Sequence, residues 1–417
     1  MSEIQRPKAV AFVVPGWPRQ EFPNGIVSYT THMRAELRRQ GIRVFVLAHK
    51  MTAPTKDEDV VSVQPSTSNR GVINGYVERI GRRLAPAYTV ARRHSSTIVR
   101  ETQRLQREFG LELVQMEESF GWPRMVVPRC PVPTVVRLHG PWFLVGVAAG
   151  RADKPDSIHR VHCEGKGIAM AAGISTASQV VLERVREHYG LALENAVVIP
   201  NAITPMPADD RWSPSNCEPD RILFIGRFDR IKGGDLVIDG FRHLLSMRPQ
   251  CRLTFVGPDR GFQDDSGQIH QIKPFIEDRL PGALADGRIE WLDFQHSDSL
   301  ATLRRRANVV IVASRFETFP NTLLEAMVTG CPVASSNVGG VNEILQHERN
   351  GLIFQAGNAE SLALACKRLL EAPEFAARIA HQAGEDCNLK FNPETIASET
   401  AAFHQEVIAR HRHAMLR

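Results

Sequence analysis

The sequence predicts an α/β protein built as two Rossmann-like, doubly wound domains that face each other across a cleft. Three observations lead to this fold class. The chain has 417 residues, which is too long for one ordinary domain and fits two of about 200 residues. Short apolar runs alternate with helical stretches in both halves, as in βαβ units. Residues 204–220 are rich in proline, lack periodicity and separate the halves.

The N-terminal half begins with a buried-strand pattern over 9–14, which Pro15 and Gly16 end. A helical stretch over 27–40 stops at Gly41, and an apolar run over 44–47 completes a strand, loop, helix, strand unit. Further apolar runs lie at 111–116, 134–138 and 196–199.

The same order of elements restarts after 204–220. Strand patterns are followed by helical patterns up to about residue 357, and the chain after 358 is helical. We therefore expect an N-terminal domain over 1–203, a linker over 204–220, a C-terminal domain over 221–390, and a helix over 391–417 that packs back on the N-terminal domain. The expected strands are 222–225, 253–256, 289–292, 309–312 and 332–334, and the expected helices are 234–247, 298–306 and 320–329.

Composition restricts the class of protein. With 43% hydrophobic and 23% charged residues, the chain is typical of a globular protein, and no apolar run approaches the roughly 18 residues of a membrane span. The polar start of the chain, residues 1–8, lacks a signal-peptide core. Seven widely spaced cysteines form no CxxC pair, so neither a zinc site nor a disulfide framework is indicated. We expect a cytoplasmic protein.

Ligands of open α/β sheets bind beyond the carboxyl ends of the strands, so the loops that follow strands are the places to look for chemistry. The first such loop in the C-terminal domain is 226–234. Its glycines allow close approach of the backbone, and Arg227 and Lys232 offer positive charge to phosphate oxygens just before a helix. A solvated basic turn is the alternative interpretation.

A second loop contains two glutamates eight residues apart. Glu317 precedes a helix that we expect to start within 319–321 and to end at Gly330, and Glu325 lies inside that helix. Backbone amides at the start of the helix would face a phosphate. One glutamate could then hold sugar hydroxyls and the other a ribose diol. Ordinary helix charges are the alternative interpretation.

His139 follows the strand pattern 134–138 in the N-terminal half. Its position at a carboxyl end makes it a candidate for the site, although a lone histidine is more often a core or surface residue. The run Asp57-Glu58-Asp59 matches the Asp-x-Asp of metal-dependent transferases, but it lies in a polar loop, and we interpret it as a solvated charge run.

These features together resemble the family 4 glycosyltransferases, retaining enzymes of the GT-B fold. The first domain matches only through Gly25, His139 and its βα pattern. Two positions depart from the family pattern and affect the identity of the base: Asn24 precedes Gly25 where a second glycine is common, and Asp293 replaces a usual glycine. The segments that carry the resemblance are 198–203, 222–234, 253–257, 317–327, 330–333, 339–343 and 351–353.

The resemblance implies a role for each matching residue. Arg227 and Lys232 would bind the donor diphosphate, Glu317 the donor sugar and Glu325 the ribose. His139 would lie near the transferring sugar. Gly25 would let its loop approach the diphosphate. The donor-binding set also includes the start of the predicted helix, Phe319, Pro320, Asn321 and Thr322.

The function expected from the resemblance is metal-independent transfer of a sugar from a nucleotide diphosphate donor, UDP-sugars being favoured. The nucleotide sugar is a co-substrate, and no cofactor is expected. The acceptor would be a glycan, a lipid-linked sugar or a small molecule, and the N-terminal domain would bind it. Candidate acceptor residues, which the sequence does not rank, are Trp17, Arg19, Glu117, Glu118 and Trp142. A sugar-nucleotide epimerase of related fold and an inactive nucleotide-sugar binding protein are the alternatives.

Charge is unevenly distributed. Residues 1–200 carry a net +9 and residues 201–417 a net −4, and nine arginines lie within 70–107. On a helix over 88–109, Ala91, Ile98, Leu105 and Phe109 share one stripe. The arginines opposite form either a solvated face or a docking surface for anionic lipid headgroups or a phosphorylated acceptor. Docking on lipid headgroups would give peripheral, salt-sensitive membrane contact. Nucleic-acid binding is not expected, because no recognised motif or interleaved aromatic residues accompany the arginines. The basic face consists of Arg92, Arg93, Arg100, Arg104 and Arg107.

Overall fold

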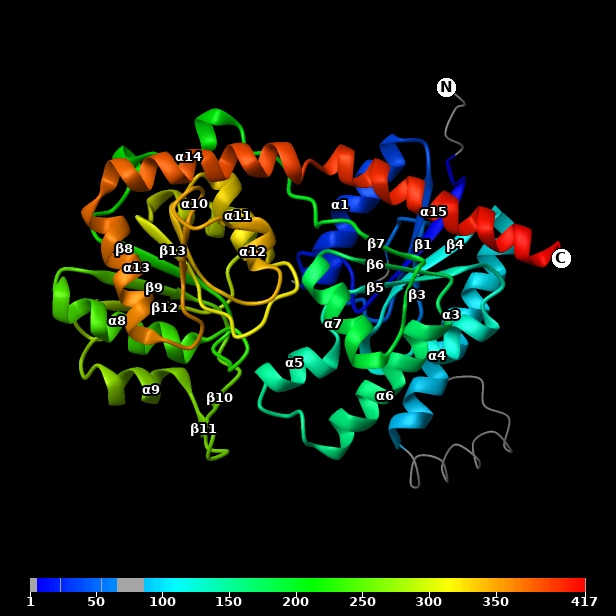
Figure 1. Cartoon of the computed structure of the whole chain (residues 1–417), viewed down its shortest axis with the longest axis horizontal. Coiled ribbons are helices and arrows are strands. Elements are labelled where there is room, and N and C mark those ends of the chain that lie inside the picture. The colour runs from blue at the N-terminus through cyan, green and yellow to red at the C-terminus, as the bar shows by residue number, and fades with distance from the viewer. Residues whose placement is uncertain (1–5, 23, 54, 66–85, 417) are drawn as a thin grey trace. The chain divides into compact units, whose positions relative to one another are not determined.

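The computed structural model describes residues 6–22, 24–53, 55–65 and 86–416. The chain divides into two compact units, which Figure 1 shows in the colours of the sequence. Unit 1 comprises Met1–Phe143, Asp153–Ala202 and Pro393–Arg417, and unit 2 comprises Leu144–Ala152 and Ile203–Asn392. The chain therefore leaves unit 1 after Ala202 and returns to it at Pro393.

Unit 1 is built on a seven-stranded parallel sheet with the order β3-β2-β1-β4-β5-β6-β7 among the described residues. Its strands are β1 (Ala9–Val14), β2 (Arg43–Ala48), β3 (Val60–Ser62), β4 (Leu113–Glu117), β5 (Thr134–Leu138), β6 (Gly173–Thr176) and β7 (Ala196–Val198). Its helices are α1 (Gly25–Arg39), α3 (Pro86–Phe109), α4 (Pro123–Val126), α6 (Pro155–Met170), α7 (Gln179–Tyr189) and α15 (Pro393–Met415), and short turns are η1 (Ser119–Gly121) and η2 (Val127–Arg129). Helix α5 (Trp142–Ala148) crosses the boundary between the units.

Unit 2 contains a six-stranded parallel sheet with the order β12-β9-β8-β13-β14-β15 among the described residues. Its strands are β8 (Arg221–Ile225), β9 (Arg252–Val256), β12 (Ile289–Leu292), β13 (Val309–Val312), β14 (Val333–Ser336) and β15 (Leu352–Phe354), with a hairpin of β10 (Phe262–Gln263) and β11 (Ile269–His270). Its helices are α8 (Gly234–Met247), α9 (Ile272–Arg279), α10 (Ser297–Arg306), α11 (Asn321–Thr329), α12 (Val341–Ile344), α13 (Ala359–Glu371) and α14 (Pro373–Lys390), and short turns are η3 (Ala208–Asp210) and η4 (Pro214–Asn216).

The predicted fold class of two Rossmann-like, doubly wound sheets is confirmed. Each sheet reverses its strand order once, between β1 and β4 in unit 1 and between β8 and β13 in unit 2. Such switch points open a crevice at the carboxyl ends of the two strands, where open α/β sheets bind ligands. The loops after these four strands are therefore the places at which each unit can hold a ligand.

Helix α15 belongs to the core of unit 1. Its apolar side chains Ile396, Phe403 and Val407 are buried in one cluster with residues of β1 and α1, among them Phe12 and Met33. The segment predicted as a linker, 204–220, lies in unit 2 and is held there by Trp212, whose backbone N–H donates to Thr329 and whose indole N–H donates to Ala307.

Two details of unit 1 differ from the sequence predictions. Asp57-Glu58-Asp59 is only partly solvated, because Arg34 binds Asp57 and Arg43 donates to buried Asp59 at 2.9 Å. In α3, Ala91, Ile98 and Leu105 are buried as predicted, but Phe109 is 40% exposed and packs against Phe45 and Arg43.

The arginine face of α3 also carries acidic partners. Arg104 donates to Glu101 and Glu108, and Arg100 lies 3.4 Å from Glu101. These pairs reduce the positive charge that the face offers to an anionic surface. No described helix is both long enough and apolar enough to cross a membrane.

Candidate functional site

The loop after β8 holds two cations in place through one aspartate. Asp229 accepts a 2.6 Å hydrogen bond from Nε of Arg227 and a 2.8 Å bond from the backbone N–H of Lys232. Phe228 between them is fully buried and anchors the loop in the core of unit 2. Gly233 has φ 70°, and a Cβ there would lie 2.1 Å from the carbonyl oxygen of Ala313. Only glycine therefore lets this loop approach the end of β13.

Lys232 and Glu317 meet across the switch point of unit 2. The Lys232 Nζ lies 2.5 Å from Oε1 of Glu317, and the Ser314 hydroxyl donates to the same oxygen at 2.6 Å. The backbone N–H of Gly340 donates to the Glu317 carbonyl at 3.1 Å. A Cβ at Gly339 would lie 1.8 Å from that carbonyl oxygen. The glutamate is thus fixed by the loops after β13 and β14, next to the cation that the loop after β8 supplies.

Helix α11 begins beside this pair. It covers Asn321–Thr329, within the predicted bounds, and ends at Gly330 with φ 77°. Pro320 at its start is buried and makes no side-chain cap, so first-turn amides such as that of Thr322 point out of the helix end. The ring of Phe319 packs against Phe391 at 5.4 Å in the core, so the structure assigns that side chain a packing contact.

Glu325 lies one turn farther along α11 and forms an ion pair with the buried Arg304 of α10. The pair fixes the carboxylate on the surface of the helix near its start. A ligand that approached Glu325 would therefore meet a carboxylate whose orientation is already set.

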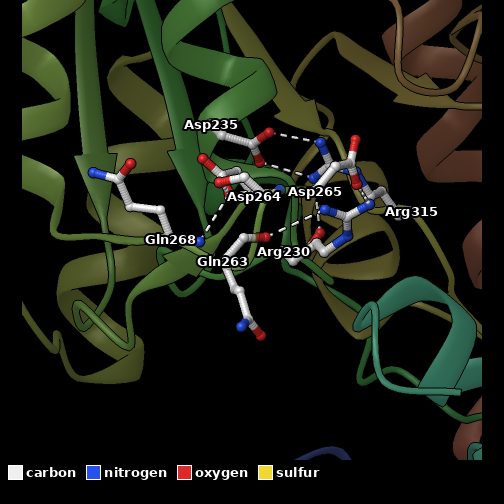
Figure 2. A network of polar contacts seen from close by, with 8 residues as sticks. Arg230, Asp235, Gln263, Asp264, Asp265, Gln268 and Arg315 are labelled. Atoms are coloured by element: carbon white, nitrogen blue, oxygen red, sulfur yellow. Dashed lines mark hydrogen bonds and ion pairs between the residues drawn. The ribbon is translucent and has the colours of Figure 1, made fainter. Parts of the chain in front are cut away.

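A network of arginines and aspartates holds the backbone of the loop after β8 in place (Figure 2). Arg315 forms two hydrogen bonds with Asp235 at 2.8 and 2.6 Å and donates to the backbone carbonyl of Arg230 at 2.8 Å. Arg230 in turn contacts Asp265 at 2.6 Å and the carbonyl of Gln263 in the hairpin. Because Arg315 bonds to the start of α8 and to the loop at once, it holds the backbone that presents Lys232. Sequence analysis did not identify this network, although Asp235 and Arg315 flank the two motifs.

His139 lies in unit 1, directly after β5. Its backbone N–H and that of Gly140 donate to the two carboxylate oxygens of Glu118, at 3.0 and 2.8 Å. Its ring packs edge-on against Tyr29 at 5.5 Å. Burial, followed by the charge of Arg137, lowers the pKa of His139 well below its usual 6.5, so the imidazole is neutral at physiological pH.

Gly25 is the first residue of α1, also in unit 1. Asn24, one of the departures from the family pattern, caps this helix, because its side chain accepts a 2.8 Å hydrogen bond from the N–H of Ile26. Asp293, the other departure, lies exposed after β12 and accepts a hydrogen bond from the N–H of Phe294.

The structure thus brings Arg227, Lys232, Glu317 and the start of α11 together in unit 2, whereas Gly25 and His139 lie in unit 1. The unit 2 group offers two cations, helix amides and a carboxylate, which suit a diphosphate joined to a hydroxyl-bearing group. No three histidine, cysteine or acidic side chains gather as a metal-binding group in the described parts of the chain.

Comparison with known proteins shows which family the chain resembles. The model of "Glycosyltransferase Family 4" matches residues 23–205, and that of "Glycosyl transferases group 1" matches 207–386. A D-inositol 3-phosphate glycosyltransferase of Streptomyces avermitilis is 26% identical over 403 residues, which cover 93% of this chain and 84% of that protein.

Two solved structures have the same fold. Sucrose-phosphate synthase of Thermosynechococcus elongatus superposes with a TM-score of 0.73 at 19% identity, over 97% of this chain and all of that one. HepE of Anabaena in complex with UDP-glucose gives a TM-score of 0.67 at 18% identity, over 97% and 99% of the two chains. The chain belongs to the family 4 glycosyltransferases and is a hexosyltransferase-type enzyme with the GT-B fold.

Proposed function

We propose that this enzyme is a retaining glycosyltransferase that moves a hexose from a UDP-sugar to a glycan, lipid-linked or small-molecule acceptor without a metal ion. The observation that carries the proposal is the contact of Lys232 with Glu317, beside Arg227 and the start of α11. A cation and a sugar-binding carboxylate at one switch point suit the two ends of a sugar diphosphate. The complex of HepE with UDP-glucose supports UDP as the nucleotide of the donor.

The proposed reaction depends on charge stabilisation at the leaving group. Negative charge builds on the diphosphate as its bond to the anomeric carbon stretches, and positive charge builds on the sugar ring. Arg227, Lys232 and the first-turn amides of α11 would stabilise the diphosphate. Glu317 would bind sugar hydroxyls, and Glu325 would hold the ribose diol.

The protonation state of His139 limits the role that it can have in the reaction. A neutral imidazole can exchange a hydrogen bond with a sugar hydroxyl, but it adds no positive charge beside a ring that is itself becoming cationic. We assign it the positioning of the transferring sugar.

Two measurements test the proposal directly. A thermal-shift screen of nucleotide sugars should single out a UDP-hexose, since a ligand that binds only the folded state raises its apparent stability. Incubation with that donor and an acceptor should release UDP, and NMR of the product should show the donor's anomeric configuration. Interconversion of two UDP-sugars without release of UDP would establish the epimerase alternative. Donor binding without any reaction would establish the inactive binding protein.

Variants test the roles of the residues. Arg227→Ala and Lys232→Ala should each lose about 2–4 kcal/mol of transition-state stabilisation, as removal of a preorganised charge contact does. Glu317→Gln should reduce turnover more than UDP affinity. Arg252→Ala is the control, because Arg252 is an exposed arginine at the opposite end of the same sheet. Wild-type turnover in all three site variants would refute the assignment.

A further inference from the structure

The loop after β4 in unit 1 contains a strained aromatic residue. Phe120 has φ 59° and ψ 6° inside the short turn Ser119–Gly121, and Gly121 also has a positive φ of 64°. A bulky side chain is an outlier in the left-handed region, and such strain gathers at functional sites. A Cβ at Gly121 would lie 2.3 Å from the Cβ of Cys163, so the glycine allows the loop to pack on α6. Phe120 is thereby 55% exposed beside the switch point of unit 1.

Phe120 belongs to a continuous set of ring and cation contacts. Its ring centroid lies 5.5 Å from that of Trp122, which stacks on His94 at 4.9 Å. The guanidinium of Arg160 lies 4.3 Å from the Phe120 ring centroid and 4.0 Å from that of Trp142. Flat aromatic faces of this kind provide a large apolar contact at low entropic cost, and the polar groups around them add orientation.

Three buried polar atoms in and beside this cluster make no hydrogen bond within the described residues. They are Oε2 of Glu117, Nε1 of Trp142 and Nε2 of His49. Glu117 and His49 are each only 5% exposed, and the His49 ring lies 4.5 Å from that of Trp122. Buried polar groups are normally paired, so unpaired ones at a switch point indicate partners that a ligand supplies.

The charges around the cluster indicate what kind of ligand that is. Among the described residues, Arg160 is the cation that acts on Glu117, Glu118 and Glu164 alike, and its Nε already donates to Glu164 at 2.6 Å. Burial and the neighbouring carboxylates raise the pKa of Glu117 to about 8 and that of Glu164 to about 7. The buried Arg137 donates through Nη2 to the carbonyl of Ile199 and to Asn201, while its Nε and Nη1 make no hydrogen bond within the described residues. Its guanidinium lies 4.0 Å from the Tyr29 ring centroid and the residue is only 1% exposed, so it presents no charge at the surface. The nearby cations Arg124 and Lys166 lie beside Cys163 of α6, where their charges oppose the rise that burial causes in the pKa of its thiol. A phosphate placed on this surface would meet carboxyl groups rather than free cations, whereas hydroxyl groups could bond with them.

We propose that Glu117, Phe120 and Trp142 form the acceptor subsite and bind an uncharged pyranose. The Phe120 ring would stack on one face of the sugar, the Trp142 indole N–H would donate to a hydroxyl, and the Glu117 carboxyl would bond to another. The inference rests on the proposed function and narrows its acceptor to a neutral saccharide. It separates this enzyme from the relatives whose name specifies D-inositol 3-phosphate.

The test is ligand-observed NMR on the full chain, which requires no turnover. The probes are methyl α-D-glucopyranoside, methyl N-acetyl-β-D-glucosaminide, maltose and inositol 3-phosphate. At least one neutral saccharide should bind, and Phe120→Ala should weaken that binding about tenfold, whereas Phe120→Tyr retains the ring and should restore it. Glu117→Gln should weaken it several-fold. Phe109→Ala is the matched control, since it removes another part-exposed phenylalanine of unit 1.

Three results would overturn the inference: no binding of any neutral saccharide, equal binding by folded Phe120→Ala, or tighter binding of inositol 3-phosphate than of every saccharide. Circular dichroism establishes that each variant is folded. UDP release from UDP-glucose is measured separately. If the wild type binds saccharides but releases no UDP from any donor, the proposed function fails. If it releases UDP but binds no saccharide, only the subsite fails.

Discussion

Replacing Glu117 by Gln should stabilise the protein at neutral pH and have little effect in acid. Burial, followed by repulsion from Glu118, raises the pKa of the Glu117 carboxyl from its usual 4.5 to about 8. The folded chain keeps a proton that the unfolded chain loses above pH 4.5, so the free energy of unfolding falls as the pH rises from 4.5 to 8. With about 1.4 kcal/mol per pKa unit, the wild type should lose on the order of 3 kcal/mol between pH 5 and pH 7.5 through this group.

The Glu117→Gln variant has no such proton to lose. The difference in the free energy of unfolding between this variant and the wild type should therefore grow by on the order of 3 kcal/mol from pH 5 to pH 7.5. Urea unfolding at pH 5, 6, 7 and 7.5, followed by circular dichroism and tryptophan fluorescence, measures the difference. Separate transitions of the two units are fitted individually, because a two-unit chain need not unfold in one step. Glu58→Gln, at an exposed position, is the control and should show no widening. A constant difference between wild type and Glu117→Gln from pH 5 to pH 7.5 would refute the reasoning. A stabilised variant with weaker saccharide binding is the pattern expected of a binding group retained at a cost in stability.

Arg315→Lys keeps the charge but loses the two-pronged contact with Asp235, so kcat/KM for the UDP-sugar should fall about tenfold. Arg349→Lys, which breaks a similar pair with Asp386, is the control, and equal effects of the two variants would contradict a positioning role for Arg315. Activity should survive excess EDTA, and complete loss that magnesium or manganese restores would contradict metal independence. If the basic face of α3 docks on membranes, the protein should co-sediment at low salt with anionic liposomes more than with neutral ones. A variant in which Glu replaces Arg100, Arg104 and Arg107 should lose this preference. Equal binding of the wild type to both kinds of vesicle would show that the face is only a solvated helix surface.

Local patterns predicted the elements of unit 2 closely. Helix α8 and strands β12 and β13 have the predicted bounds, because long apolar runs and helix-ending glycines are local signals. The positions of Lys232 and Glu317 after strands followed from the same patterns. Their contact did not, since the two residues are 85 apart and meet only because β8 pairs with β13.

The parts that sequence analysis missed depend on tertiary context. Strand β6 is Gly-Ile-Ser-Thr, a segment with little strand signal of its own, and it is a strand because β5 and β7 pair with both its edges. Glu117 and Trp142 were recognised as loop residues but not ranked. Their significance comes from buried atoms without partners, and that property has no local sequence signature.

The position of α15 in the core of unit 1 affects how the chain folds during synthesis. Ribosomes release a polypeptide from its N-terminus, so residues 203–392 emerge before the helix that buries Phe403 and Val407 against β1 and α1. Unit 2 can therefore complete its core while unit 1 still exposes the apolar surface that α15 covers. The nascent N-terminal segment must remain unaggregated over that interval, and transiently exposed apolar surface of this kind is what chaperones protect.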